Sequence, residues 1–405
     1  MRTFNSWIDL IIIDADSFDI ETIERFIGEV QDVKVCMLSA KDLPALSISP
    51  SNLKWYKISY PIHFLPLKEF KRIINDFDST VFSTGILSSN IIVLKELFRI
   101  PITGILFATN SSVRWESCGR LPDFIISEPS QLEKISSGIH QGYVAEAVAI
   151  KRVYHLSGLV RVIAITSRLQ SKESGHEYCL VSGGRYFKLE DQRSKTNYIG
   201  AMVLKNKKSL IYQNDFNKIF HFLLKHGVKT RFDGITRVPP KIGDTKWDRF
   251  KQIVNNLCRD FNCIDYSDSL DSLPEIISQK KLSTSKRWEN TKGKFVFKQN
   301  VDGEHIILLD DVITSGATTL SCADSIMECG ASRVTIVTIL INQFYDARLD
   351  SSLIIPKCPC GGDFSLRVNS TDGSFFYGCS NYPMCTNKLC LSDWNIKLDI
   401  KNEDS

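Results

Sequence analysis

The sequence predicts an α/β protein with two domains built on parallel sheets and a small metal-stabilised segment near its C-terminal end. Three observations support this fold class. Apolar strands alternate with helix-like stretches over residues 1–130, which is typical of a parallel sheet. A second apolar run, 306–309, ends in two acids and a loop of small residues. Five of the 12 cysteines lie between Cys358 and Cys390, which indicates a metal site rather than disulfides.

The composition is that of a globular protein. Hydrophobic residues make up 43% and charged residues 24% of the 405 positions, enough for two or three domains. A net charge of +4 is too small to indicate nucleic-acid binding by itself. The sequence holds no apolar run of the length that spans a bilayer. The first apolar stretch is interrupted by Asp9 and lacks a signal-peptide cleavage site, so we expect a cytoplasmic protein with reduced cysteines.

The N-terminal strand Ile11–Ile13 ends in Asp14-Ala15-Asp16, and the next strand ends at Ser39. This order resembles the haloacid dehalogenase (HAD) superfamily over roughly residues 8–130, and we expect a HAD-like Rossmannoid domain over 1–130. The resemblance implies that Asp14 is a nucleophile, that Asp16 is a general acid–base, and that both bind Mg²⁺. A strand is expected over Val81–Ser83, and Ser83-Thr84-Gly85 stands where the family has an acidic turn. Without that ligand for Mg²⁺ we expect a degenerate, structural or ligand-sensing domain.

Residues 131–185 are harder to interpret. A helix is expected over Ala145–Leu156 and a strand over Val160–Ile165. The segment is either a connector or the hood of the domain that follows.

The most informative segment is the run from Ile306 to Thr318. Its apolar strand delivers Asp310 and Asp311 to the carboxyl edge of a sheet, where open α/β sheets bind ligands. The following loop offers backbone N–H groups, hydroxyls and a helix N-terminus to a phosphate. Its residues are Thr314, Ser315, Gly316, Ala317 and Thr318. The two acids suit ribose hydroxyls or a magnesium shell beside that phosphate.

This segment resembles the binding motif for phosphoribosyl pyrophosphate (PRPP) of type I phosphoribosyltransferases. The resemblance implies a transferase α/β domain over residues 186–350. It also implies that Asp310 and Asp311 hold the ribose hydroxyls with Mg²⁺, and that the loop holds the 5-phosphate.

Two upstream blocks carry polar and basic residues that a pyrophosphate leaving group would need. Together with the acid pair they resemble ComF-type proteins over roughly residues 232–340. The resemblance implies a pyrophosphate-binding turn and a flexible loop that closes over the site. The turn comprises Val238, Pro239, Pro240 and Lys241, followed by Lys246 and Arg249, and the loop carries Lys281, Arg287 and Asn290. Arg249-Phe250-Lys251-Gln252 departs from the Arg-Gly-Phe-Asn-Gln of the family.

The C-terminal cysteines form two knuckles joined by a predicted hairpin, an arrangement that can bind zinc through four thiolates. Over residues 355–395 the pattern resembles the zinc ribbons of type IA DNA topoisomerases. The expected ligands are Cys358, Cys360, Cys379 and Cys385. Only Pro359 separates the first two cysteines, where the family has two residues, so Cys390 is a candidate substitute ligand.

In the topoisomerase family such ribbons bind single-stranded DNA. Aromatic rings that stack on bases and cations that contact phosphates are the expected means of binding. The candidates are Phe375, Phe376, Tyr377 and Tyr382 with Lys357, Arg367 and Lys388. The alternative is that the aromatic side chains form the core of the ribbon itself.

The leading functional prediction is a phosphoribosyltransferase that uses PRPP and Mg²⁺ to transfer ribose 5-phosphate to an unknown nitrogen nucleophile, with a structural Zn²⁺ and a link to nucleotides or nucleic acid. The first alternative is a non-catalytic PRPP- or nucleotide-sensing module that the ribbon tethers to single-stranded DNA or RNA, as in a stress or antiviral effector. A HAD phosphatase is the second. By analogy with type I transferases we expect a homodimer, and a regulatory protein or RNA partner stays open.

Overall fold

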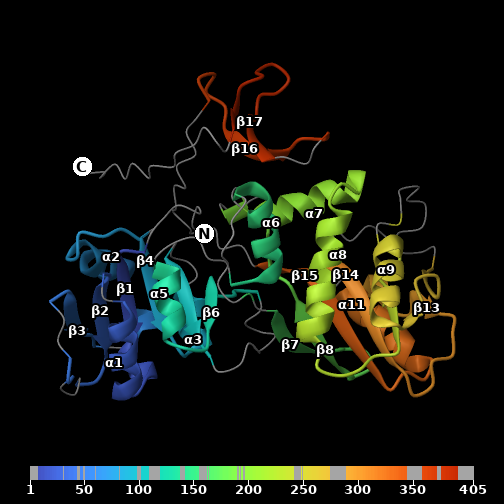
Figure 1. Cartoon of the computed structure of the whole chain (residues 1–405), viewed down its shortest axis with the longest axis horizontal. Helices are drawn as coiled ribbons and strands as arrows, with labels where there is room; N and C mark the ends of the chain where they lie inside the picture. Colours follow the sequence, from blue (N-terminus) through green and yellow to red (C-terminus); the bar gives the residue numbers. More distant parts are fainter. Residues whose placement is uncertain are drawn as a thin grey trace.

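The computed structural model contains two α/β domains and a small β-ribbon (Figure 1). It describes residues 8–30, 32–42, 46–48, 51–59, 61–81, 83–97, 102–108, 119–136, 142–154, 162, 164–188, 191, 193–194, 197–240, 248, 250–273, 289–343, 358–371 and 375–390. No helix within these ranges is long and apolar enough to cross a membrane.

The first domain is a parallel sheet of six strands in the order β3-β2-β1-β4-β5-β6. The strands are β1 (Leu10–Asp14), β2 (Lys34–Ser39), β3 (Leu53–Lys57), β4 (Thr84–Ser88), β5 (Thr103–Phe107) and β6 (Phe124–Ile126). The connecting helices are α1 (Ile20–Glu29), α2 (Leu67–Asn75), α3 (Ile91–Leu97) and α5 (Ser130–Ser136), with 3-10 turns η1 (Ala15–Ser17) and η2 (Ile62–Phe64). This strand order is that of a doubly wound sheet, whose topological switch point lies between β1 and β4.

The alternation of side chains along β1 explains why helices cover both faces of this sheet. Ile11 and Ile13 pack in one cluster with Phe26 of α1. Leu10 and Ile12 pack in another with Phe70 of α2. The α/β prediction for this part of the chain is confirmed.

One sequence-based boundary in the first domain is wrong. A strand was expected over Val81–Ser83, with Ser83-Thr84-Gly85 at its carboxyl end, but β4 spans Thr84–Ser88. Residues Thr80–Ser83 form a turn in which the Ser83 N–H donates to Thr80 O at 3.1 Å. The carboxyl end of β4 is therefore Ser88-Ser89-Asn90, which is also without an acid.

The second domain has a sheet in the order β11-β10-β14-β15-β8-β7, and β9 also pairs with β15. These strands are β7 (Ile165–Gln170), β8 (Glu177–Ser182), β9 (Arg185–Phe187), β10 (Gly234–Arg237), β11 (Ile264–Asp265), β14 (His305–Ile313) and β15 (Arg333–Gln343). All pairs are parallel except β7 with β8. The helices are α6 (Val144–Tyr154), α7 (Tyr198–Ser209), α8 (Gln213–Phe222), α9 (Lys251–Phe261) and α11 (Ala317–Glu328), with the π-helical turn η4 (Leu223–Gly227). A separate hairpin joins β12 (Leu270–Ser272) to β13 (Phe295–Phe297).

Helices cover both faces of this second sheet as well. Ile307 and Leu309 of β14 pack in one cluster with residues of α6, α7, α8 and α9. Ile306 and Leu308 pack in another with residues of α11. Successive residues of β14 therefore face different helices, which decides where its two acids point.

The segment 131–185 is divided between the two domains. Helix α5 packs beside α1 on the first sheet, whereas α6 packs against α7 and α8. Strands β7 and β8 belong to the second sheet, so that sheet draws on residues that precede position 186. Of the strand expected over Val160–Ile165, residues 160, 161 and 163 lie outside the described residues, and β7 begins at Ile165.

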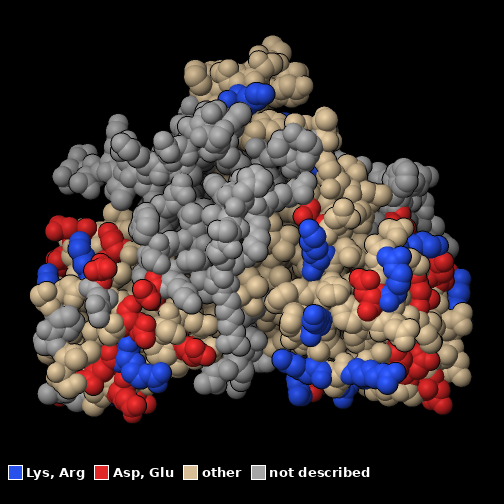
Figure 2. Space-filling model, in the orientation of Figure 1, with Lys and Arg blue, Asp and Glu red and all other residues tan. Residues whose placement is uncertain are grey.

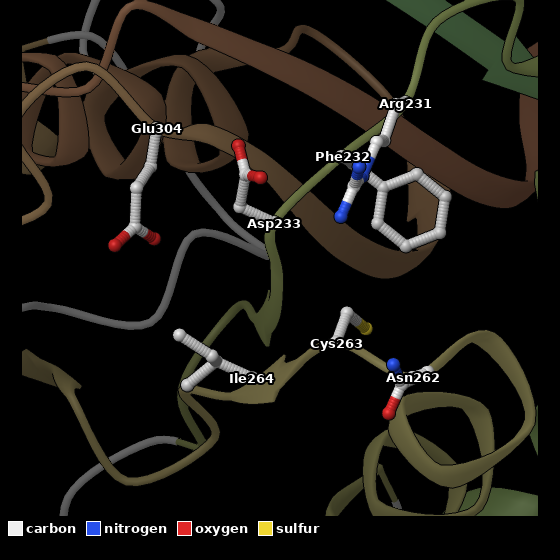
Figure 3. Close-up of a pocket in the computed structure, with 7 residues that line it drawn as sticks. All are labelled: Arg231, Phe232, Asp233, Asn262, Cys263, Ile264 and Glu304. Atoms are coloured by element: carbon white, nitrogen blue, oxygen red, sulfur yellow. The ribbon is translucent and has the colours of Figure 1, made fainter.

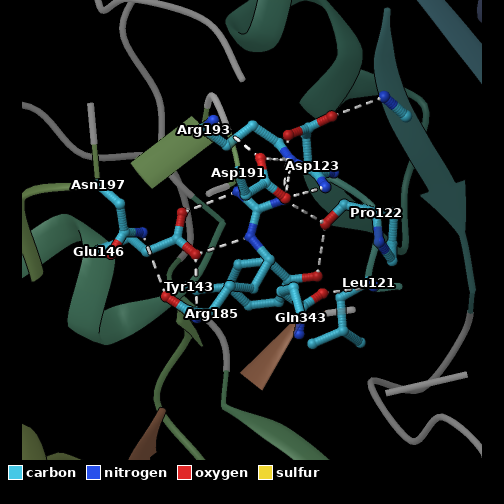
Figure 4. Close-up of polar contacts among 11 residues, drawn as sticks. Leu121, Pro122, Asp123, Tyr143, Glu146, Arg185, Asp191, Arg193, Asn197 and Gln343 are labelled. Atoms are coloured by element: carbon cyan, nitrogen blue, oxygen red, sulfur yellow. Dashed lines mark hydrogen bonds and ion pairs between the residues drawn. The ribbon is translucent and has the colours of Figure 1, made fainter. Parts of the chain in front are cut away.

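A buried polar cluster joins the two domains (Figure 4). Arg185 of β9 has a side chain that is only 3% exposed. Its Nε contacts Glu146 Oε1 at 2.8 Å, and its Nη1 donates to Asp123 Oδ1 at 3.0 Å. Gln343 Oε1 also accepts from the Leu121 N–H at 2.9 Å. Burial is the largest single influence and raises the pKa of Asp123, but the opposing influences, led by the charge of Arg185 and including the Gly104 N–H, together lower it. The junction therefore holds paired charges.

Candidate functional site

The acid pair lies within a strand rather than after one. Strand β14 continues to Ile313 because β15 pairs with it beyond the apolar run, with Asp310 opposite Thr338. Neighbouring strand residues face opposite sides of the sheet, so Asp310 and Asp311 point in different directions. Asp310 Oδ2 accepts from Thr319 Oγ1 of α11 at 3.0 Å. Asp311 Oδ2 contacts Lys207 Nζ of α7 at 3.1 Å.

A cavity of about 140 Å³ lies beside Asp310. It is lined by Val238, Asp310, Val312, Thr314, Ser315, Gly316, Ala317, Thr318 and Thr319. Gly316 has a φ of 81°, and a Cβ there would lie 3.2 Å from Leu320 Cδ1. A glycine is therefore favoured where the loop turns into α11. All five predicted loop residues, and Asp310 of the two acids, line this cavity.

The other predicted site residues are only partly described. The Val238 N–H donates to Leu309 O at 2.9 Å, which holds the Val238–Pro240 turn beside β14. Lys241, Lys246, Arg249, Lys281 and Arg287 lie outside the described residues. Asn290 is half-buried and precedes β13. The predicted flexible loop therefore connects the two strands of the β12–β13 hairpin.

Two cations near this edge were not identified from the sequence. Arg237, the last residue of β10, is 6% exposed and pairs with Asp248. Asp248 Oδ1 also accepts from the Phe250 N–H at 3.1 Å, so this pair ties the end of β10 to the start of α9. The sequence signal that could have identified Arg237 is the presence of an arginine in the buried strand 234–237. Lys207 lies in Lys205-Asn206-Lys207-Lys208, which is typical of a solvated helix end.

At the carboxyl edge of the first sheet the predicted residues do come together, but they bond to one another. Asp14 is 4% exposed, and its Oδ2 accepts from Ser88 Oγ at 2.7 Å. Asp16 accepts from Ser39 Oγ at 2.7 Å and from the Ala40 N–H at 2.8 Å. The edge thus combines Asp14, Asp16 and Ser39 with Ser88, which the sequence reasoning missed because it placed β4 too early.

The four expected zinc ligands form one cluster. Their sulfur atoms all lie within 4.8 Å of one another, and the four residues are Cys358, Cys360, Cys379 and Cys385. The Cys358–Cys385 and Cys360–Cys379 Sγ distances are 3.6 and 3.4 Å. Tetrahedral zinc with Zn–S bonds of about 2.3 Å places its sulfurs about 3.8 Å apart, so this cluster could hold a zinc ion. Cys390 lies on β18 (Lys388–Cys390), but its side chain is outside the described residues, so its role as a substitute ligand stays a prediction.

N–H donors lie beside the sulfur atoms of Cys358 and Cys360. Asn387 Nδ2 donates to Cys358 Sγ at 3.3 Å, and Asn381 Nδ2 donates to Cys360 Sγ at 3.5 Å. The Gly362 N–H and then the neighbouring thiols lower the pKa of Cys360 to about 6. Such N–H donors around the ligands orient them and favour their metal-binding form.

The aromatic residues of the ribbon divide into two groups. The ribbon strands are β16 (Phe364–Val368), β17 (Phe375–Cys379) and β18. Tyr377 is 1% exposed and packs with Phe364 in a small core. Tyr382 is 62% exposed, and the guanidinium of Arg367 lies 5.8 Å from its ring centroid. The side chain of Phe375 and the whole of Lys357 lie outside the described residues. The ring of Tyr377 therefore belongs to the core of the ribbon, whereas the ring of Tyr382 is exposed.

The ribbon rests on the second domain, because β16 packs against α7 (Figure 1). Acidic and basic side chains are interspersed on the face of both domains that Figure 2 shows. That face carries no large single-sign patch among the described residues.

Comparison with known proteins gives limited matches. No family model matches the chain. DNA topoisomerase 1 of Pyrococcus horikoshii is 36% identical over 67 residues, which cover 13% of this chain and 10% of that protein. DNA topoisomerase 1 of Pyrococcus furiosus is 34% identical over 76 residues, or 12% and 7%. The chain thus spans a tenth or less of the length of these relatives. The short matches and the four-cysteine cluster fit a C-terminal zinc ribbon.

Among solved structures, the UMP synthase of Leishmania donovani aligns with 84% of this chain and 66% of its own. The TM-score is 0.23 and the sequence identity is 11%. A score this low carries no argument about the fold. The class supported by the coordinates is an α/β protein with two largely parallel sheets and a ribbon with four clustered cysteines.

Proposed function

We propose that the second domain binds PRPP with Mg²⁺ and transfers ribose 5-phosphate to a nitrogen nucleophile. The observation that carries this proposal is the 140 Å³ cavity, which combines Asp310, hydroxyl groups and the N-terminus of α11. Backbone N–H groups at a helix N-terminus favour phosphate, and a neighbouring carboxylate favours sugar hydroxyls. The resemblance of Ile306–Thr318 to the PRPP motif names the ligand that unites these two groups.

The proposed reaction breaks the bond between ribose C1 and a pyrophosphate oxygen while a nitrogen lone pair forms the new bond to C1. The nitrogen loses its proton to solvent. Bound Mg²⁺ would supply charge neutralisation for the departing pyrophosphate, and Asp310 is the described residue placed to help hold it. The loop and Asp310 fix the phosphate and the ribose, so most of the protein's contribution is positioning.

Isothermal titration calorimetry with Mg²⁺ and PRPP tests this site. We expect one binding event per chain for the wild type and none for the Asp310→Asn, Asp311→Asn double variant. Circular dichroism should show that both proteins are folded. Equal affinity of the two folded proteins would overturn the site assignment. If only the wild type binds PRPP, release of pyrophosphate in the presence of candidate bases identifies the acceptor.

The second candidate is a non-catalytic PRPP or nucleotide sensor that the ribbon tethers to single-stranded DNA or RNA. The exposed Tyr382 with Arg367 beside it favours this reading, since such pairs stack on bases and contact phosphates. PRPP binding without turnover would support it, together with binding to a fluorescent oligonucleotide that Tyr382→Ala weakens.

The ribbon itself can be tested by zinc analysis. Cys385→Ser should lose the metal and oligonucleotide binding, because structural zinc supplies about 10–16 kcal/mol in small zinc domains. Cys390→Ser is the matched control and should keep both. Loss of zinc in Cys390→Ser alone would assign the fourth ligand to Cys390.

A HAD-like phosphatase in the first domain is the remaining candidate. The position of Asp14, Asp16 and Ser39 at one sheet edge supports it, and the hydroxyl group of Ser88 at the end of β4 opposes it. We therefore propose a degenerate domain without hydrolase activity. Phosphatase activity that Asp14→Asn abolishes would contradict this.

A further inference from the structure

Two cysteines meet where helix α9 ends. Asn262 follows the last helical residue with φ 51° and ψ 57°, a left-handed conformation. The Cys263 N–H then donates to Cys258 O at 3.0 Å. This 6→1 hydrogen bond is that of a Schellman motif, which brings the side chains on either side of the left-handed residue together. The local fold therefore places Cys258 and Cys263 next to each other.

The backbone geometry lies within reach of a disulfide. A hydrogen bond of 3.0 Å between these groups limits the two Cα atoms to a separation of at most roughly 7 Å. Disulfides join Cα atoms about 4.4–6.8 Å apart. The Cys258 Sγ–H donates to Ile264 O, one residue beyond Cys263, at 3.3 Å. The Cys258 thiol thus points toward the segment that carries Cys263.

Cys263 also lines an open pocket of about 410 Å³ (Figure 3). The pocket lies at the start of β10 and β11, at the opposite edge of the sheet from the proposed phosphate site. Its two acids are engaged, since Asp233 accepts from the His305 N–H at 2.9 Å and Glu304 from Tyr266 OH at 3.0 Å. Arg231 and Cys263 lie on facing sides. A small oxidant can therefore reach the Cys263 sulfur from solvent.

We propose that Cys263 and Cys258 are a redox modification site, which a hydroperoxide converts into an intramolecular disulfide. The Cys263 thiolate attacks the peroxide O–O bond, which gives a sulfenic acid and releases an alcohol, or water in the case of hydrogen peroxide. Cys258 then attacks that sulfur, the S–O bond breaks, and water leaves with the thiol proton. Two thiols and one peroxide thus give one disulfide, one alcohol and one water. A dithiol reductant reverses the change.

The surroundings of Cys263 and of Cys329 shift the pKa of the two thiols in opposite directions. The Cys258 thiol lowers the pKa of Cys263, although burial and the nearby Asp265 and Asp233 act against this. Burial raises the pKa of Cys329, which is also half-buried. The thiolate is the reactive form, so Cys263 should react before Cys329. This inference is independent of the proposed transferase activity.

Mass spectrometry of the full-length, zinc-loaded protein tests the proposal. Trypsin cuts after Arg259 and so separates the two cysteines into different peptides. After treatment with hydrogen peroxide, we expect a cross-linked pair of these peptides that dithiothreitol releases. Cys258→Ser should instead accumulate a sulfenic acid at Cys263 that dimedone traps, and Cys263→Ser should leave Cys258 unmodified. Cys329→Ser is the matched control and should form the same cross-link.

A second measurement on the unmodified protein avoids the risk that a variant misfolds. Iodoacetamide should label Cys263 faster than Cys329 at neutral pH, because the thiolate is the reactive form. Equal labelling rates, or peroxide treatment that oxidises Cys263 without linking it to Cys258, would overturn the proposal.

Discussion

The carboxyl edges of the two sheets carry similar residues and differ in what surrounds them. At the first edge, Asp14 and Asp16 accept hydrogen bonds from Ser88, Ser39 and the Ala40 backbone. At the second edge, Asp310 lines a cavity of about 140 Å³ together with the loop that starts α11. The acids of the first edge thus accept hydrogen bonds from neighbouring groups of the fold, whereas Asp310 of the second edge borders a cavity. Acids near the carboxyl edge of a sheet are therefore a stronger candidate site where a cavity lies beside them.

The largest expected effect separates the two edges by ligand binding. Asp310→Asn removes the charge beside the cavity, and hydrogen bonds to charged groups contribute about 1.5–3 kcal/mol. We expect the affinity for Mg²⁺ and PRPP to fall by about ten- to a hundredfold, since 1.4 kcal/mol corresponds to a factor of ten. Titration calorimetry measures this change directly.

Asp14→Asn is the matched control at the first edge. It should leave the PRPP affinity unchanged, because Asp14 lies in the other sheet. Equal losses of PRPP affinity in the two variants would mean that the second edge is not the specific binding site for PRPP.

The next expected effect is a loss of stability, and it falls on the first edge rather than on the second. Ser88→Ala removes the donor to Asp14 Oδ2 in a buried position. We expect the free energy of unfolding to fall by about 1–3 kcal/mol, the usual cost when a buried polar group loses its partner. Chemical denaturation of the first domain measures it. Ser89→Ala removes an exposed bond to Ser17 O and should cost less. If Ser88→Ala were silent, the first edge would not depend on its internal hydrogen bonds.

Local sequence signals predicted the cysteine cluster of the ribbon, and they singled out the loop that lines a cavity with Asp310. The apolar run, the acid pair and Thr314–Thr318 are contiguous, and each follows from local chemistry. The knuckles of the ribbon are also local, and the four cysteines that they contain do cluster. The cysteine cluster is thus a prediction that the structure supports, and one short segment supplies all four of its cysteines.

Residues that act across the fold were harder to predict. Lys207 contacts Asp311 from a helix that lies about a hundred positions earlier in the chain, and no pattern in residues 198–209 indicates that partner. The predicted bounds of β4 were wrong because Thr80–Ser83 and Thr84–Ser88 are both short stretches that favour a strand. Only the pairing with β1 decides which of the two forms it. Sequence periodicity alone does not predict which stretch pairs with a neighbouring strand, because tertiary contacts decide it.

A third prediction tests the shape of the second edge. Gly316 and Gly303 both have positive φ, but a Cβ at Gly316 would lie 3.2 Å from Leu320 Cδ1, whereas Gly303 has open space around it. Alanine at either position should cost about 1–2 kcal/mol of stability from the left-handed backbone. Only Gly316→Ala should also weaken PRPP binding, because the loop must shift. Calorimetry and thermal unfolding of both variants separate the two effects, and equal PRPP affinities would show that the loop does not contact the ligand.

The smallest expected effect concerns the second acid of the pair. Asp311 faces α7 rather than the cavity, and its partner Lys207 has a side chain that is 40% exposed. Solvent screening limits such a half-exposed ion pair to about 1 kcal/mol or less. Lys207→Met should therefore change the PRPP affinity by a factor of about five or less, the ratio that 1 kcal/mol represents. Lys205→Met is the control, since residues two apart on a helix do not face the same side. A loss as large as that of Asp310→Asn would mean that Lys207 itself contacts the substrate, and that the site extends through the sheet edge to α7, the helix on which the ribbon rests.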